Sequence, residues 1–132
     1  MRQELRNKDT GNTLTRYWKS FCHALNGIKY AIRYEHNMYI IITAMIVVIS
    51  GGIFFKISIT EWLFCILAIG LVMATELINS SIEAVCDLVT LKNHPLIKIA
   101  KDTASGATLI FSITSAMIGI VIFIPKIINF FY

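Results

Sequence analysis

Apolar residues gather in three long runs that occupy most of the chain after residue 37. The first run, Met38 to Phe55, is interrupted only by Thr43, Ser50 and two glycines. The second, Ile57 to Thr75, carries one early charge, and the third, Ala104 to Ile124, carries none. A helix needs about 20 predominantly apolar residues to cross a bilayer. The pattern therefore predicts an all-α integral membrane protein with three membrane-spanning helices.

A further helix is predicted ahead of these runs, over residues 13–34. Large apolar side chains recur there at steps of three or four, at Leu14, Trp18, Phe21, Leu25, Ile28 and Ile32. Basic residues lie off that stripe, which is typical of an amphipathic helix on the cytoplasmic membrane surface. The pattern also fits an ordinary packing helix of a bundle, but the adjoining span and the aromatic residues favour the surface helix. Residues 1–12 are polar, and we expect them to be flexible.

The breaks between the runs fit a single domain of 132 residues. We expect three membrane-spanning helices with cytoplasmic extensions, over residues 38–55, 57–91 and 97–124. The second helix is expected to end before Pro95, whose ring disfavours helix there and at the preceding residue. Gly51 and Gly52 indicate a close approach or a bend near the end of the first run. The small residues from Ala104 to Ala107 suit close packing of helices in lipid.

The distribution of charge predicts the orientation in the membrane. Seven of the twelve Lys and Arg residues precede the first run, and three more lie between the second and third runs. The positive-inside rule therefore places the N-terminus and residues 76–103 in the cytoplasm. The net charge of +4 fits anionic lipid better than nucleic acid as a partner. The first 37 residues are too polar for a cleavable signal peptide, and three scattered cysteines form neither a disulfide framework nor a zinc site.

Acidic residues concentrate at the end of the second run. Glu76, Asn79, Glu83 and Asp87 recur at helical spacing and share one stripe of the predicted helix. Glu35 precedes the first run at the same cytoplasmic boundary. An ionisable group at membrane depth costs about 3 kcal/mol or more and is usually functional. The stripe suggests a divalent cation and chemistry on a polar group attached to a lipid.

The chemistry of these side chains suggests separate roles. Glu35 and Glu83 could share a Mg²⁺ ion, which binds few carboxylates and leaves room for phosphate oxygens. Lys101 could neutralise a transferring phosphoryl group. Glu76 is nearest the lipid, and partial desolvation there suits a general base that takes a proton from a hydroxyl group. There is no Walker A motif, Gly-rich kinase loop, or HRD or DFG motif.

Two classes of function remain open from the residues alone. A metal or proton site facing the cytoplasm is favoured, and phosphoryl transfer is one chemistry that such a site could perform. A small proton- or ion-conducting membrane protein is the alternative. A relay needs acids distributed through the bilayer, whereas these acids gather at one face and the third run has none.

A resemblance to a known family adds to this interpretation. The stretch ELINSSIEAVCD from Glu76 to Asp87 is followed by His94-Pro95 and then by AKDTASGA over residues 100–107. This sequence resembles the signature of the prokaryotic diacylglycerol kinase family, which reads E-x-x-N-[ST]-[AS]-[IV]-E-x-x-x-D, then H, then A-K-D with small residues after it. Residues 26–29 and 33–37 match its N-terminal part. The resemblance runs from about residue 13 to the end and is greatest to the Gram-positive branch, which is similar to undecaprenol kinase.

The resemblance implies a homotrimer in the bacterial cytoplasmic membrane, with composite active sites at the cytoplasmic interface. It implies MgATP as phosphoryl donor and a lipid alcohol as acceptor, undecaprenol first and diacylglycerol as the alternative. Carried over by position, Glu76 is the proton acceptor, Asn79 orients the site and Asp87 supports it. Lys101 serves both catalysis and nucleotide binding.

The remaining implied residues belong to the nucleotide and metal sites: Arg16, His23, Glu35, Glu83, His94 and Asp102, with Glu35 and Glu83 as the metal ligands. His23 departs from the family, which more often has Tyr or Phe at that position. Two plainer interpretations stay open. Asp87 could be an acid that solubilises a helix end, and His94 could be only a loop residue.

Overall fold

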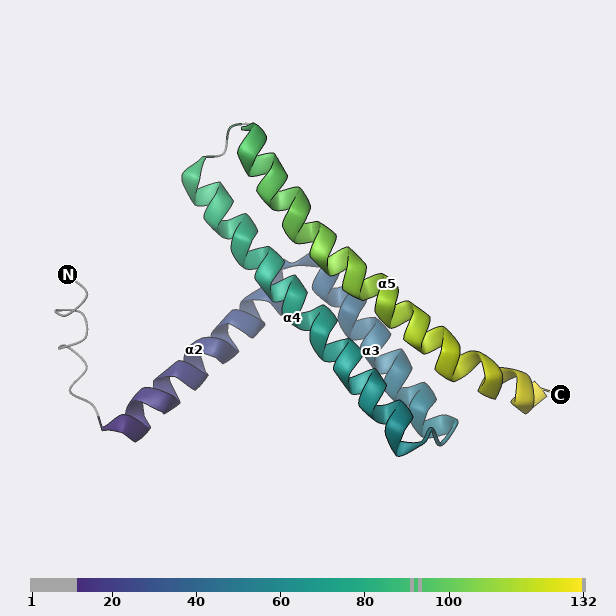
Figure 1. Cartoon of the computed structure of the whole chain (residues 1–132). Helices are drawn as coiled ribbons and strands as arrows, with labels where there is room; N and C mark the ends of the chain where they lie inside the picture. The colour runs from purple at the N-terminus through teal and green to yellow at the C-terminus, as the bar shows by residue number, and fades with distance from the viewer. Residues whose placement is uncertain (1–11, 91, 93, 132) are drawn as a thin grey trace. The chain divides into compact units, whose positions relative to one another are not determined.

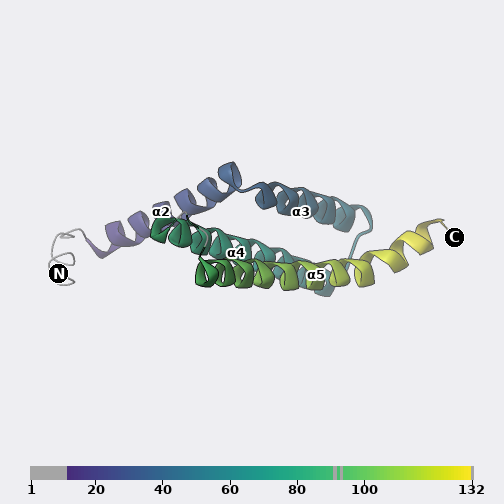
Figure 2. The same ribbon diagram turned by 90° about the horizontal axis from the view of Figure 1, so that it is seen from above.

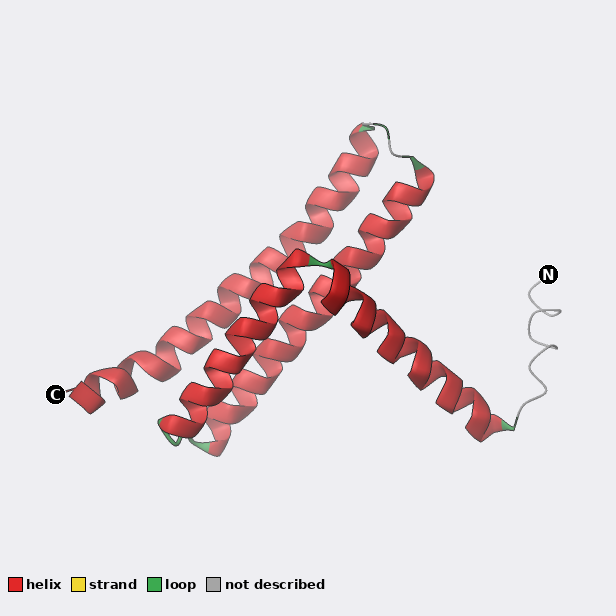
Figure 3. Cartoon of the chain, turned by 180° about the vertical axis from the view of Figure 1, so that it is seen from behind, coloured by secondary structure: helices red, strands yellow, loops and turns green. Residues whose placement is uncertain are grey.

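The computed structural model describes residues 12–90, 92 and 94–131. Within those residues every regular element is an α-helix, as Figure 3 shows. The helices are α2 (Thr13–Tyr34), α3 (His36–Phe54), α4 (Ile59–Val89) and α5 (Pro95–Phe131). The last three are long and apolar enough to cross a membrane. The predicted all-α class is confirmed, whereas the segment expected to be flexible lies outside the described residues except for Asn12.

The chain divides into two units, residues 1–34 and residues 35–132. The first unit contains α2, whose large apolar residues are exposed along its length. The rings of Trp18 and Phe21 are 6.0 Å apart, and those of Tyr30 and Tyr34 are 4.8 Å apart. The helix has the apolar and aromatic face predicted from the sequence, and its position at a membrane surface remains a prediction.

The second unit contains the three long helices, of which α4 is the central one in sequence and in contacts. It packs more extensively against α5 than against α3. Figures 1 and 2 show α4 and α5 running side by side in opposite directions, joined by a short connection that contains Lys92. Helix α4 therefore has both of the other long helices as neighbours.

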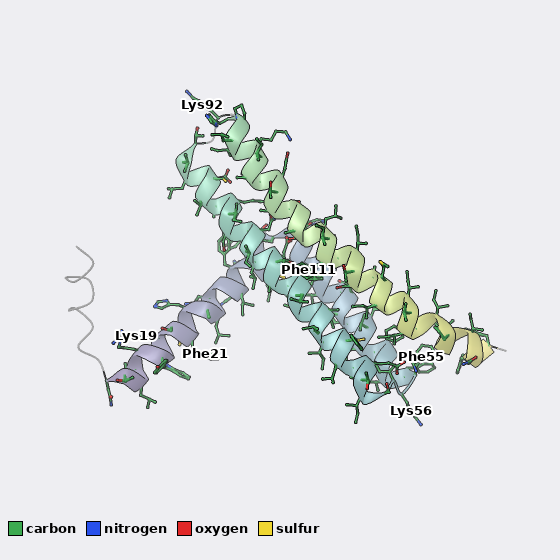
Figure 4. All side chains as sticks on the ribbon, in the orientation of Figure 1. Lys19, Phe21, Phe55, Lys56, Lys92 and Phe111 are labelled. Atoms are coloured by element: carbon green, nitrogen blue, oxygen red, sulfur yellow. The ribbon has the colours of Figure 1, made fainter. Side chains whose placement is uncertain are left out.

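The turn between α3 and α4 is tightly packed. Ser58 caps α4, and its side chain and that of Glu61 exchange hydrogen bonds with the backbone in a capping box. Lys56 has a positive φ of 50°, and Figure 4 shows its side chain pointing away from the helices. A Cβ atom on Gly52 would lie 2.7 Å from Cη2 of Trp62. The close approach predicted at the glycine pair is confirmed.

Helix α5 is longer than the apolar run that predicted it. It begins at Pro95 and continues through Pro125 to Phe131, whereas the sequence suggested residues 97–124. Proline suits the first position of a helix because its nitrogen has no hydrogen to leave unpaired. An interior proline is also tolerated in membrane helices. Beyond it, Nζ of Lys126 pairs with Glu61 of α4 at 3.0 Å, which holds the extended end against its neighbour.

Candidate functional site

Helix α4 carries two buried polar side chains at the centre of its acidic stripe. Glu76 is 1% exposed and Asn79 is 4% exposed, while Glu83 is half-buried one turn further on. Nδ2 of Asn79 donates a hydrogen bond of 3.0 Å to Oε1 of Glu83. The helical spacing that predicted a shared face therefore gives a connected group of side chains.

Helix α3 contributes two residues to this group. Glu35 is the residue that precedes the first turn of α3, and its carboxylate makes no capping hydrogen bond there. The side chain of Asn37 lies within interaction range of the carboxylate of Glu76. Glu35 and Glu83 are both near enough to Glu76 to interact with it electrostatically. The structure thus brings together three carboxylates that the sequence places on two separate helices.

Three buried oxygen atoms near this group have no hydrogen-bond partner of normal geometry among the described residues. They are Oε2 of Glu76, Oδ1 of Asn79 and Oγ1 of Thr108. Buried polar atoms are paired in the great majority of cases, so unpaired ones call for a functional explanation. Thr108, on α5, is the residue that sequence reasoning missed. The signal was a hydroxyl-bearing residue one helical turn after Ala104, within a run that has no charge.

A second group of predicted residues lines a pocket where α4 meets α5. The pocket has a volume of about 570 Å³, and its lining includes Asp87, His94, Lys101 and Asp102. Nζ of Lys101 donates to Oδ1 of Asp87 at 2.6 Å, and Lys98 forms an ion pair with Asp102. Four of the residues implied by the family resemblance therefore share one concave surface that combines positive and negative groups.

Two predicted residues belong to the other unit. Arg16 and His23 both lie on α2, and both side chains are exposed. Their assignment to a nucleotide site stays a prediction.

The oxygen atoms of the site suit a metal that is shared with a substrate. Among the described residues, no group of three or more His, Cys, Asp or Glu side chains is placed to hold a metal ion by itself. Mg²⁺ commonly takes one or two carboxylates and completes its octahedron with water and substrate phosphates. Glu35 and Glu83, which both interact electrostatically with Glu76, are carboxylates of that kind, so the residues present fit Mg²⁺ that arrives with a nucleotide.

Comparisons with known proteins identify relatives over most of the chain. Residues 22–123 match the family model described as prokaryotic diacylglycerol kinase. The chain is 43% identical over 120 residues to undecaprenol kinase of Bacillus subtilis, an alignment that covers 91% of this chain and 98% of that protein. It is 32% identical over 111 residues to a diacylglycerol kinase of Synechocystis, covering 83% and 63% of the two chains. It is 38% identical over 96 residues to a diacylglycerol kinase of Helicobacter pylori, covering 72% and 74%.

Proposed function

The chain belongs to the prokaryotic diacylglycerol kinase family, and we propose that it transfers the γ-phosphoryl group of ATP to undecaprenol at the cytoplasmic face of a bacterial membrane. Family membership and three membrane-length helices make it a membrane-embedded lipid kinase that uses ATP. Undecaprenol is the favoured acceptor because the undecaprenol kinase matches nearly the whole of both chains. The diacylglycerol kinases match with lower identity over shorter alignments.

The observation that carries the mechanism is a buried carboxylate, Glu76, beside two others. Transfer to an alcohol requires that the hydroxyl proton be accepted as the new O–P bond forms, and a carboxylate within hydrogen-bond reach can accept it. Glu76 has one oxygen atom that is buried and unpaired. Its neighbour Leu77 is apolar, which fits contact with a lipid at the level of its headgroup. We assign Glu76 as the general base.

The other side chains serve binding and charge neutralisation. Phosphoryl transfer depends mainly on positioning and on stabilising the charge of the transferred group. Glu35 and Glu83 would hold the Mg²⁺ ion that accompanies ATP and offsets the charge of its phosphates. Lys101, oriented by Asp87, supplies a cation at the rim of the pocket between α4 and α5. His94 and Asp102 lie in the same pocket and are assigned to nucleotide binding. Arg16 and His23 of α2 are assigned to nucleotide binding from the family resemblance alone.

A homotrimer with its N-terminus in the cytoplasm is part of the same proposal. A groove of about 470 Å³ runs between α4 and α5, and small residues of α5 form one wall: Ala100, Thr103, Ala104 and Ala107. Small residues let helices approach closely in lipid. The basic residues ahead of α3 support a cytoplasmic N-terminus by the positive-inside rule.

The acceptor can be tested directly with purified protein in mixed micelles. Radiolabelled ATP is supplied with undecaprenol or with diacylglycerol at equal mole fractions, and the labelled lipid is separated. We expect faster labelling of undecaprenol. Faster labelling of diacylglycerol would overturn the proposed acceptor, and no labelling of either lipid would count against the activity itself.

The base can be tested with Glu76→Gln, which keeps the shape of the side chain and removes the basic oxygen. We expect kcat to fall by roughly 10²–10⁴-fold, the usual effect of losing a general base, with little change in the affinity for MgATP. Thr43→Val is the control, because Thr43 is exposed and its hydroxyl group bonds only its own helix. If Glu76→Gln mainly weakens MgATP binding and leaves kcat intact, Glu76 is a metal ligand rather than the base.

A further inference from the structure

Three contacts fix the alignment of α4 with α5. Asp87 meets Lys101 near the connection between the helices, Oγ of Ser115 donates to the carbonyl oxygen of Ala68 at 3.4 Å, and Glu61 meets Lys126 at the far end. The two helices run in opposite directions, so a position on α4 between two of these contacts faces the corresponding position on α5.

Thr108 lies level with Glu76 in this alignment. Glu76 is about halfway along α4 between Asp87 and Ala68, and Thr108 is halfway along α5 between Lys101 and Ser115. The Thr108 side chain is within interaction range of the Glu76 carboxylate. Register and proximity agree that this hydroxyl group faces the proposed base.

The hydroxyl group of Thr108 also does not donate to the backbone of its own helix, as threonine and serine hydroxyl groups often do. Hydroxyl groups on α3, α4 and α5 that donate to the carbonyl oxygen four residues earlier are those of Thr43, Thr75, Ser80, Ser81, Thr103 and Thr114. Such bonds satisfy the hydroxyl locally and leave it with no donor for another group. Oγ1 of Thr108 makes no hydrogen bond of normal geometry, although it is shielded from solvent. Its donor is therefore available to the carboxylate opposite.

The carboxylate of Glu76 has one oxygen atom that accepts no hydrogen bond from the described residues. Oε2 of Glu76 is buried and unpaired, while the side chain of Asn37 on α3 lies within interaction range of the same carboxylate. Catalytic hydrogen bonds are often long or poorly aligned in a free enzyme and tighten in the complex with substrate. Donors from the two helices that flank α4 would together fix the plane of the carboxylate, in which its basic lone pairs lie.

We propose that Thr108 is a positioning residue for this kinase, which donates a hydrogen bond from α5 to the carboxylate of Glu76 and orients it toward the acceptor hydroxyl. This inference rests on the proposed role of Glu76 as the base. It adds the third helix to the catalytic machinery. The plainer interpretation is that Thr108 fills space between α4 and α5 with its methyl group.

Two pairs of variants separate the hydroxyl from the packing. Thr108→Val keeps the size and shape of threonine without the hydroxyl, and Thr108→Ser and Thr108→Ala differ from each other by the hydroxyl alone. A hydrogen bond to a charged group is strong enough that we expect Thr108→Val and Thr108→Ala to lower kcat by roughly 10-fold or more. Thr108→Ser should keep kcat, and KM for MgATP and for undecaprenol should change by less than about twofold in all three variants.

Thr43→Val is the matched control, because it removes a threonine hydroxyl that bonds its own helix at 2.8 Å and is exposed. We expect normal kcat from it. Circular dichroism and the thermal transition of each variant in detergent check that the helices form. If Thr108→Val does not fold, the comparison of serine with alanine carries the test.

Combination with Glu76→Gln shows whether Thr108 acts through the base. In that background Thr108→Val should lower the residual kcat by less than about twofold, because the orientation of a missing base has no effect. A full 10-fold further loss, or equal losses from serine and valine, would overturn the inference. If Glu76→Gln is inactive while Thr108→Val is normal, this inference alone is wrong. If Glu76→Gln retains its kcat, the proposed base is wrong and the inference falls with it.

Discussion

The contact between Gly52 and Trp62 allows a sharp prediction about the packing of α3 on α4. A Cβ atom at Gly52 would lie 2.7 Å and 2.8 Å from Cη2 and Cζ2 of Trp62, and 3.0 Å from Cδ1 of Ile57. Carbon atoms pack at about 3.5–4.0 Å, so the indole ring would have to move by most of an ångström. Trp62 and Ile57 belong to the cluster that also contains Cys65 and Ile122, and this cluster limits the movement.

The magnitude follows from two opposing effects. Overpacking costs about 1–3 kcal/mol, whereas alanine is favoured over glycine in a helix by about 1 kcal/mol. The difference between the two effects is a loss of about 0–2 kcal/mol. Because three atoms lie within 3.0 Å of the added Cβ, we expect Gly52→Ala to lower the free energy of unfolding by an amount in the upper half of that range. At Gly51 the nearest atom is Cε1 of Phe123 at 3.1 Å, a ring edge that can move slightly, so Gly51→Ala should be close to neutral. At Gly70 nothing lies within 4 Å, so Gly70→Ala should be neutral or slightly stabilising.

The assay is equilibrium unfolding in mixed micelles, followed by circular dichroism and tryptophan emission. Trp62→Phe removes the ring atoms that the new Cβ would meet. In the double variant, the further loss caused by Gly52→Ala should therefore nearly vanish. Equal stability of the three alanine variants, or an undiminished loss in the Trp62→Phe background, would refute the steric explanation.

Two further predictions concern the metal and the assembly. Glu35→Ala and Glu83→Ala should each abolish turnover while leaving a folded, membrane-inserted protein, and normal Mg²⁺ dependence in either variant would exclude that residue as a ligand. Gly106→Leu should weaken the oligomer and the activity together, measured by cross-linking and kinase assay; nothing lies within 4 Å of a Cβ there in one chain, so the position is open to a second copy. A fully active monomer in detergent would count against the composite site.

The membrane helices could be predicted because apolar runs are long and their composition is unambiguous. The ends of α5 could not be predicted in this way. An apolar run indicates which residues lie in lipid, whereas a helix ends where its backbone hydrogen bonds end. The run stops at Ile124, but the backbone continues as far as Phe131, and the Lys126 pair with Glu61 lies on this extension. A proline inside the helix, Pro125, looks like a stop signal in the sequence.

The acidic stripe of α4 was visible in the sequence because its residues follow one another at helical spacing. The partners of that stripe were harder to find, since they come from elsewhere in the chain. Thr108 cannot be distinguished from Thr114 by sequence, yet Thr114 bonds its own backbone at 2.9 Å and Thr108 does not. The pairing of Lys101 with Asp87 was equally hidden, because it depends on how the helices align across their connection.

Polar contacts lie at both ends and near the middle of the α4–α5 pair, and this links the fold to the chemistry. Lipid tails are as apolar as leucine, so membrane helices associate through van der Waals packing and interhelical polar contacts rather than through the hydrophobic effect. Ion pairs at both ends of the α4–α5 pair distinguish one register from the next, because a shift by one helical turn would break each of them. The same contacts set the position of Thr108 along the helix axis relative to Glu76. The residues that hold the helices in register thereby also determine which hydroxyl group faces the base.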